Sequence, residues 1–178
     1  MCMKQLPNLI APAFFAAVFM FLATAGRAQT TKEEYLIKFE NGKQFTLDVL
    51  AKMPDSGMDY RTDPEAMSFK EQIHHIANSI VVISQGYLNG PAEAPAIDLK
   101  TASRAELAKY VEEAYDYGIA CSRGLSEAES GEGIDMFGMS VTRRQIEALV
   151  MDHATHHRGS AIAYLRANAV EPPGFVGF

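Results

Sequence analysis

Cysteine is scarce in the sequence: Cys2 and Cys121 are the two cysteines among 178 residues, and tryptophan is absent. Cys2 lies in an N-terminal segment that has the pattern of a secretory signal peptide, so cleavage would leave Cys121 alone. A single cysteine forms neither an internal disulfide nor a Cys-His zinc ribbon. The fold must therefore depend on its hydrophobic core, and Cys121 is expected to be a half-buried apolar residue of a helix.

Long hydrophobic runs are also scarce. The run from Leu9 to Ala23 is shorter than the ~18–20 residues that a transmembrane helix needs. Lys4 precedes it, and Gly26-Arg27-Ala28 provides the small residues expected before a cleavage point. This predicts a signal peptide over residues 1–28 and an exported domain over 29–178, periplasmic or secreted and without stable membrane insertion. An uncleaved N-terminal anchor is the alternative.

Basic residues are outnumbered, since 16 Lys and Arg face 22 Asp and Glu, giving a formal net charge of −6. The leader contains Lys4 and Arg27 but no acidic residue, so its removal changes this charge from −6 to −8. An acidic domain without a basic stripe excludes nucleic acid and anionic membrane surfaces as partners. The expected partner is a small-molecule substrate or ligand. A homodimer is also expected for a bundle of this kind, although the sequence does not locate an apolar patch for it.

Repeats, long linkers and the alternating pattern of half-buried strands are absent as well. The apolar periodicity instead predicts four long helices, over residues 31–52, 68–87, 103–123 and about 140–169. Ser-x-x-Glu capping boxes mark the starts of the second and third helices. The acidic, glycine-rich segment 126–138 is expected to be a loop. These elements predict one all-α domain, a four-helix bundle, whose connections are not short enough to assume a simple up-down order.

Histidine is the last scarce residue type, with five in the chain, and it is concentrated at two places. On a helical wheel of about 100° per residue, His153 and His157 fall within about 20° of Ile146, at the centre of an apolar stripe that also contains Leu149. His156 lies at the border of this stripe. The wheel therefore predicts that His153 and His157 point inward, one turn apart.

An inward pair of histidines four residues apart can converge on one metal ion, because their Cβ atoms lie ~5–6 Å apart. The alternative is two core histidines that are each hydrogen-bonded to a separate partner. His74 and His75 on the second helix offer a third ligand. Both lie away from the centre of the apolar stripe of that helix, so the periodicity does not choose between them.

Three segments resemble the DinB/YfiT-like superfamily of four-helix metalloproteins: KMPDSGMDYRTDPEAMSF, FKEQIHHIANSI and HATHHRGSAIAYLRANAVEPP. The resemblance covers almost all of the chain after the leader, and its most specific part is His-x-x-x-His-Arg-Gly followed by Pro-Pro. It implies that one histidine of the second helix and the two of the fourth helix hold a metal. The family pattern His-Ile-Ala selects His75, so the implied ligands are His75, His153 and His157. Ser160 stands where the family usually has glutamine, which puts the surroundings of the metal in question.

Three neutral imidazoles leave coordination positions open for water or substrate, which is typical of catalytic rather than structural sites. Such an ion brings bound water to a pKa of ~7 or polarises a carbonyl. One divalent transition metal is expected, nickel or zinc, with iron or manganese as further options. Tyr164 shares the inward stripe and is the candidate pocket residue. Arg158 lies at the periphery of the wheel, as a salt-bridge or helix-end residue or as a ligand for a substrate anion.

The resemblance implies a metal-dependent enzyme of unknown substrate, either hydrolase-like or a thiol-dependent transferase. Export argues against the second, because the low-molecular-weight thiols used by such transferases are chiefly cytosolic. The rival hypothesis is an exported bundle that binds a metal or a small ligand without catalysis.

Overall fold

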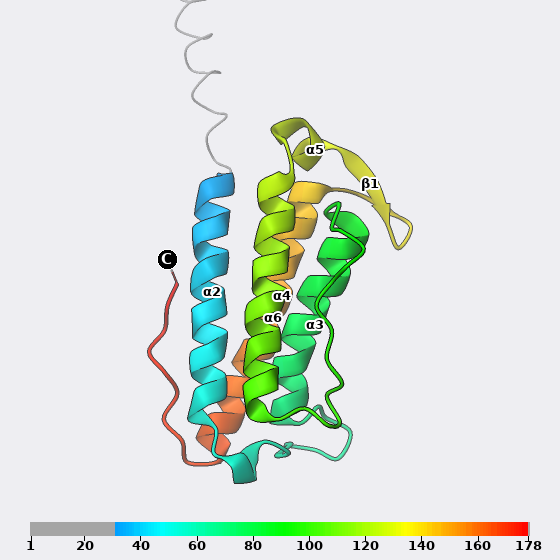
Figure 1. The fold of residues 1–178 in the computed structure, drawn as a ribbon. Coiled ribbons are helices and arrows are strands. Elements are labelled where there is room, and N and C mark those ends of the chain that lie inside the picture. The colour runs from blue at the N-terminus through cyan, green and yellow to red at the C-terminus, as the bar shows by residue number, and fades with distance from the viewer. Residues whose placement is uncertain (1–30, 178) are drawn as a thin grey trace, which may run out of the picture. The chain divides into compact units, whose positions relative to one another are not determined.

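The computed structural model describes residues 31–177, and the expected signal peptide lies outside this range. Four long helices make up most of the described chain (Figure 1), and they are α2 Lys32–Lys52, α3 Phe69–Tyr87, α4 Arg104–Gly124 and α6 Arg143–Ala167. Each agrees with a predicted helix to within about two or three residues. The capping boxes at Ser68 and Ser103 are both formed, which explains why α3 and α4 begin where the sequence predicts.

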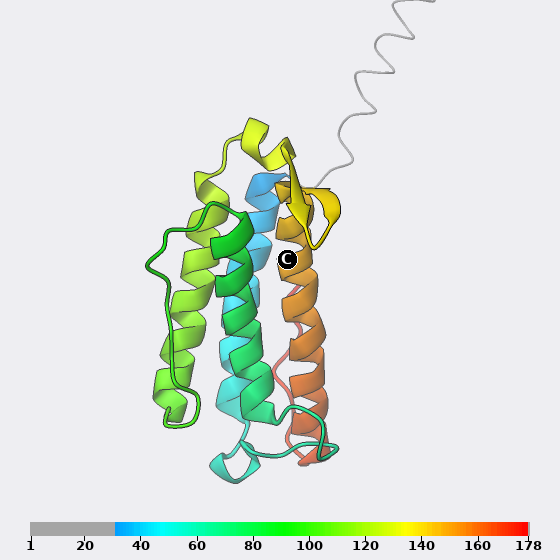
Figure 2. The same ribbon diagram turned by 90° about the vertical axis from the view of Figure 1, so that its right-hand side faces the viewer.

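The order of the helices is not simply up and down. Figures 1 and 2 show that α3 and α4 run in the same direction, while α2 and α6 run in the opposite one. The connection between α3 and α4, residues 88–103, therefore crosses the length of the bundle. In cross-section α3 packs on α4 and α6, and α2 packs on the same two helices.

The core is continuous along the bundle. Most of the predicted apolar stripe of α3 is buried, with Phe69, Ile73 and Ile76 at 0 % exposure, while Ile83 and Tyr87 at its C-terminal end are partly buried. Gly118 of α4 permits a close approach, because a Cβ atom there would lie 2.8 Å from Ile80 Cγ2 and 2.9 Å from Phe39 Cε1. None of the helices within residues 31–177 combines the length and apolarity needed to cross a membrane.

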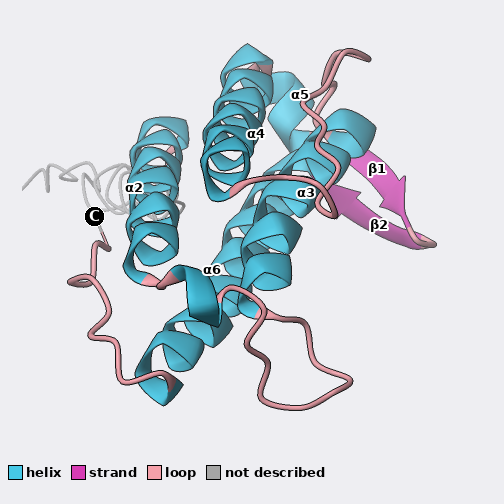
Figure 3. Cartoon of the chain, turned by 60° about the horizontal axis from the view of Figure 1, so that its bottom comes forward, coloured by secondary structure: helices cyan, strands magenta, loops and turns pink. Residues whose placement is uncertain are grey.

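The segment expected to be a loop between α4 and α6 is folded, which corrects the prediction. It contains a short helix, α5 Glu127–Gly131, and an antiparallel hairpin of β1 Gly133–Met136 and β2 Met139–Thr142 (Figure 3). Ser126 forms a capping box with Glu129, the same signal that marks α3 and α4. Phe137 and Gly138 turn the hairpin with φ of 55° and 81°. Strands of four residues are too short for alternation to be recognisable in sequence.

Candidate metal centre

Three imidazoles from two helices meet at the interface of α3 and α6. The ring centroids of His75 and His157 lie 4.4 Å apart, those of His153 and His157 4.5 Å, and those of His75 and His153 4.9 Å. One nitrogen atom from each ring lies within 4.8 Å of the others, and all three side chains are half-buried. The helical spacing of four residues stacks His153 above His157 on α6, and α3 supplies His75 from across the interface.

This donor set fits a divalent transition metal. Metal–imidazole distances of ~2.0–2.1 Å require donor nitrogens about 3–3.5 Å apart, which rotations of the side chains can reach from the observed separation. Neutral imidazole is a preferred ligand of zinc, nickel, copper and iron. Within residues 31–177 this is the one group of three or more histidine, cysteine or carboxylate side chains close enough to share an ion.

The electrostatic surroundings keep the three rings neutral. Burial, together with the neighbouring imidazoles His75, His153 and His156, lowers the pKa of His157 to about 4. Burial also lowers the pKa of His75, and burial with the neighbouring imidazoles lowers that of His153. A neutral ring retains the lone pair that a metal needs, so protons compete for these ligands less than for an exposed histidine.

Gln72 fixes the orientation of one ring. Its side-chain oxygen lies 2.7 Å from Nδ1 of His157, and the glutamine is 7 % exposed. Because an amide oxygen only accepts, Nδ1 carries the proton and Nε2 of His157 has the free lone pair. Gln72 lies three residues before His75 on the same helix. The sequence reasoning missed this residue, although a buried glutamine one turn before a candidate ligand is a signal that could have found it.

The other two histidines lie outside the cluster. His74 stacks against Tyr110, with ring centroids 5.6 Å apart and planes at 23°. His156 is exposed and touches the edge of His157, with centroids 4.9 Å apart. The structure thus separates His75 from His74, a choice that the periodicity of α3 leaves open.

Tyr164 is 5 % exposed, and its hydroxyl donates to the carbonyl of Met67 at 3.0 Å. Its ring packs edge-on against Tyr60, with centroids 5.6 Å apart. Tyr164 is therefore positioned to anchor the loop between α2 and α3, residues 53–68. Leu149, which the wheel places on the inward stripe, is 40 % exposed because it lies at the edge of that stripe, about 60° from Ile146.

Arg158 is not peripheral, which corrects the wheel: it is 8 % exposed, on the side of α6 that faces α2. Its Nη1 donates to the carbonyl of Gly42 and the hydroxyl of Thr46, both at 3.3 Å, and the guanidinium lies 5.0 Å from the centre of the Phe45 ring. A Cβ atom at Gly42 would lie 3.5 Å from Nη1. This is an ordinary van der Waals distance, so the contact with Arg158 does not by itself require glycine at position 42.

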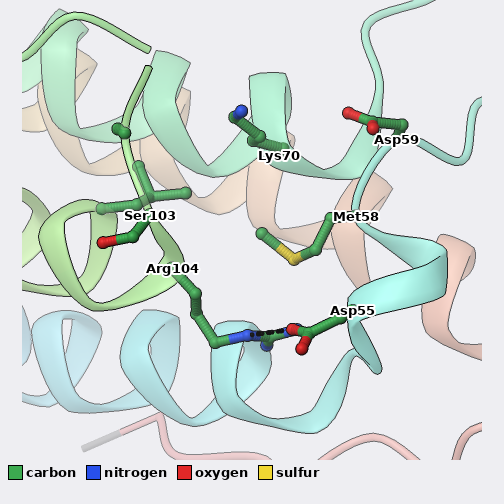
Figure 4. A pocket seen from close by; sticks show the side chains of 8 residues that line it. Asp55, Met58, Asp59, Lys70, Ser103 and Arg104 are labelled. Atoms are coloured by element: carbon green, nitrogen blue, oxygen red, sulfur yellow. Dashed lines mark hydrogen bonds and ion pairs between the residues drawn. The ribbon is translucent and has the colours of Figure 1, made fainter. Parts of the chain in front are cut away.

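A cavity of about 340 Å³ opens beside His75. The loop between α2 and α3 supplies Arg61 and Met67 to its wall, the first turns of α3 supply Glu71 and His74, and Leu99 comes from the connection to α4. A second cavity, of about 160 Å³, lies where α4 begins (Figure 4). It has no histidine in its lining, and the ion pair of Arg104 with Asp55, 2.6 Å, closes one side.

A four-helix bundle whose α3 and α6 present three converging histidines defines the class of this protein. Residues 27–177 match the DinB family, and the chain belongs to that family, as the resemblance implied.

The uncharacterised protein YjoA of Bacillus subtilis is 24 % identical over 131 residues, which are 72 % of this chain and 84 % of YjoA. The crystal structure of YjoA matches with a TM-score of 0.65 and 22 % identity, over 80 % of this chain and 96 % of that one. A DinB-like protein of Bacillus cereus matches with a TM-score of 0.69 and 15 % identity, over 81 % of this chain and 97 % of that one.

The third similar structure is YfiT of Bacillus subtilis, with a TM-score of 0.63 and 17 % identity, over 80 % of this chain and 92 % of YfiT. YfiT is described as a probable metal-dependent hydrolase with an unusual four-helix bundle topology. At these identities the three structures establish the fold of the present chain.

Proposed function

We propose that the protein is a divalent-metal-dependent hydrolase whose ion is held by His75, His153 and His157. The observation that carries the proposal is the convergence of three neutral imidazoles, with Nδ1 of His157 held by Gln72, at the edge of a cavity large enough for a small molecule. The description of YfiT as a probable metal-dependent hydrolase supports the same assignment.

A divalent ion held by three protein ligands supplies Lewis acidity, which polarises a carbonyl and makes bound water more acidic. The chain supplies the rest. Its three imidazoles remain neutral, Gln72 selects the ligating nitrogen, and the loop between α2 and α3 shields one side of the reacting group. In hydrolysis the oxygen of water bonds to the acyl carbon, the bond to the leaving group breaks, and that group takes up the proton of the water.

A binding protein without catalysis is the second candidate, and one observation favours it. Glu71 is a carboxylate of the cavity one turn before His75, but it accepts from the backbone N–H of Ser68 at 2.6 Å and pairs with Arg61 at 3.2 Å. The hydrogen bond from the Ser68 backbone, with further contributions from its side chain and Arg61, lowers the pKa of Glu71. A carboxylate with a lowered pKa is a poor general base.

Metal analysis of the purified protein tests the assignment. We expect about one transition metal ion per chain in the wild type, and its loss from His153→Ala and His157→Ala. His74→Ala and His156→Ala are the matched controls and should retain it, because neither ring belongs to the cluster. Full metal content in both His153→Ala and His157→Ala contradicts the proposed centre.

Turnover separates the hydrolase from the binding protein. The metal-loaded protein is assayed against ester and amide substrates, and His75→Ala should abolish any hydrolysis. Arg104→Gln, in the second cavity, is the control with retained activity. A protein that binds metal stoichiometrically but hydrolyses none of these substrates supports the binding protein instead.

Export through the N-terminal leader and dimerisation remain proposals that accompany this function. Size-exclusion chromatography with light scattering tests the second. Mass determination of the protein from the producing cell tests the first, through cleavage after residue 28.

A further inference from the structure

We propose that the cavity beside His75 binds a small carboxylate-bearing substrate, with Arg61 as the residue that holds the carboxylate. This inference rests on the proposed function, since it places the reacting end of the substrate at the metal centre. It adds the chemical class of the substrate: a small ester or amide that also carries a free carboxylate and has a short apolar body.

The position of the cavity is the first support. Its lining includes His75, a member of the three-histidine cluster, and also Arg61 from the loop between α2 and α3. A molecule in this space is therefore bordered by both a candidate metal ligand and a guanidinium. The volume of about 340 Å³ lies at the small end of the ~300–1,000 Å³ typical of ligand pockets, which favours a small molecule.

The side chain of Arg61 is held in place by two contacts. Its Nη1 donates to the carbonyl of Ala66 at 3.1 Å, and its Nη2 pairs with Glu71 at 3.2 Å. The hydrogen bond to Ala66 uses one of the five N–H groups of the guanidinium, and the ion pair with Glu71 restrains a second nitrogen atom. The side chain is still 40 % exposed, so part of it is accessible to a ligand. A planar guanidinium fixed at two points is suited to bidentate recognition of a carboxylate.

The charge of the occupied cavity favours an anion. The two carboxylates in the lining are Glu65 and Glu71, and Glu71 is engaged by Arg61 and by the backbone of Ser68. A divalent ion on neutral imidazoles retains both of its positive charges, because its protein ligands bring none of opposite sign. The ion and Arg61 together carry about three positive charges, against two negative charges on Glu65 and Glu71. A ligand with one negative charge balances the difference.

Apart from His74, the remaining wall is apolar and held in place. Ala66, Met67 and Leu99 contribute it, and Met67 is 38 % exposed. The Tyr164 hydroxyl bonds the carbonyl of Met67, which fixes this part of the loop. An unbranched methionine adapts to ligands of irregular shape, so the wall suits a short aliphatic or aromatic group rather than a sugar.

The test compares an acid with its neutral amide. Binding of N-acetyl-leucinate and N-acetyl-leucinamide to the zinc-loaded protein is measured by calorimetry, together with zinc content. The wild type should prefer the acid. Arg61→Gln should weaken binding of the acid by about tenfold or more and change that of the amide by less than about twofold, because one charge-assisted contact is lost. Arg61→Lys should retain part of the preference.

Arg104→Gln is the matched control, since it removes a paired arginine from the second cavity, and it should leave both affinities unchanged. Equal binding of acid and amide by the wild type, no binding of either, or an unchanged preference in Arg61→Gln overturns the proposal. Zinc content distinguishes this failure from failure of the proposed function: stoichiometric zinc with no acid preference removes only the assignment of Arg61. If the wild type binds no zinc, the proposed metal centre is wrong. The role of Arg61 is then tested on the metal-free protein alone, by whether it prefers the acid to the amide.

Discussion

At the scale of single residues, His157 is the most constrained member of the centre. Gln72 holds its Nδ1, His156 touches its ring, and the other two ligand candidates lie within 5 Å of it. The next residue along the chain, Arg158, lies about 100° further round the axis of α6 and is buried against α2. The rotation of α6 about its axis is therefore fixed from two directions at this one turn.

Replacing Gln72 tests the contribution of the hydrogen bond to His157. Gln72→Leu should weaken metal binding by about 10–100-fold, because the ring loses the partner that selects its tautomer and orientation. Gln72→Glu should retain or increase the affinity, since a carboxylate makes the imidazole more basic. Calorimetric titration with zinc measures both.

Gln85→Leu is the matched control on the same helix, since Gln85 is exposed and its side chain donates to the carbonyls of Pro91 and Ala92, away from the histidine cluster. Its affinity for zinc should equal that of the wild type. An unchanged affinity in Gln72→Leu would show that the hydrogen bond does not orient the ligand.

The lowered pKa of His157 predicts how the metal-free protein responds to acid. The pKa of His157 falls from 6.5 to about 4 on folding. At a pH between these two values, His157 is therefore protonated in the unfolded chain but neutral in the folded chain. The free energy of unfolding should therefore fall as the pH decreases from about 6.5 to about 4. Urea denaturation at pH 7 and pH 5 measures this change.

His157→Gln should reduce the loss between the two pH values. His156→Gln should preserve most of it, because the His156 imidazole is the smallest of the causes that lower the pKa of His157. Equal losses in wild type and His157→Gln would refute the assignment.

Whether the burial of a residue could be predicted from the sequence depended on the face of the helix on which that residue lies. The wheel found His153 and His157 because α6 has an apolar stripe with both at its centre. The wheel did not predict the burial of Arg158, because α6 buries a second side against α2. The buried guanidinium there is satisfied by hydrogen bonds to the Gly42 carbonyl and the Thr46 hydroxyl. These are 116 and 112 residues away in sequence, and no periodicity within α6 encodes them.

At the scale of elements, the close approach at Gly118 sets how tightly α4 packs against its neighbours. A methyl group there would overlap with Ile80 and Phe39, both at most 1 % exposed and unable to move into solvent. Gly86 of α3 is the opposite case, since a Cβ atom there has no neighbour within 4 Å.

Gly118→Ala should therefore lower the free energy of unfolding by about 1–2 kcal/mol, because overpacking outweighs the gain in helix propensity. Gly86→Ala should raise it by up to about 1 kcal/mol, since only the propensity changes. Urea denaturation of the two variants measures the difference. Stabilisation by both substitutions would show that the helices can separate to admit the methyl group.

The helices and strands could be predicted where the local sequence carries a clear signal for them. Four long helices followed from apolar periodicity, and the starts of α3 and α4 followed from the capping boxes at Ser68 and Ser103. The hairpin of β1 and β2 could not be predicted in this way. It is held by pairing across a two-residue turn at Phe137 and Gly138, and phenylalanine is not a usual signal for positive φ.

At the scale of the whole molecule, the direction of the four helices places the site. α3 and α6 run in opposite directions side by side (Figure 2), and His75 of α3 meets His153 and His157 of α6 at their interface. The sequence indicated connections too long for a simple up-down order but did not determine which helices are neighbours. That pairing depends on packing among helices distant in sequence.

Removal of metal should lower the stability of the whole domain. A ligand that binds only the folded state at about 100 times its dissociation constant adds about 2.7 kcal/mol. For a domain of this size the addition raises Tm by about 5–10 °C. Thermal unfolding with zinc and after chelation measures the shift, which should vanish in His75→Ala and persist in His156→Ala. A shift of equal size in His75→Ala would place the metal elsewhere.

The joining of α3 to α6 has a further consequence for the chain as a polymer. An ion held by His75 and His153 closes a loop of about 78 residues, a cross-link that in chain-entropy terms resembles a disulfide worth about 4.5 kcal/mol. The chain beyond residue 28 has one cysteine and makes no such covalent link internally. With metal bound, α6 should no longer detach by local opening, and its amide protons should exchange with solvent only when the entire bundle unfolds.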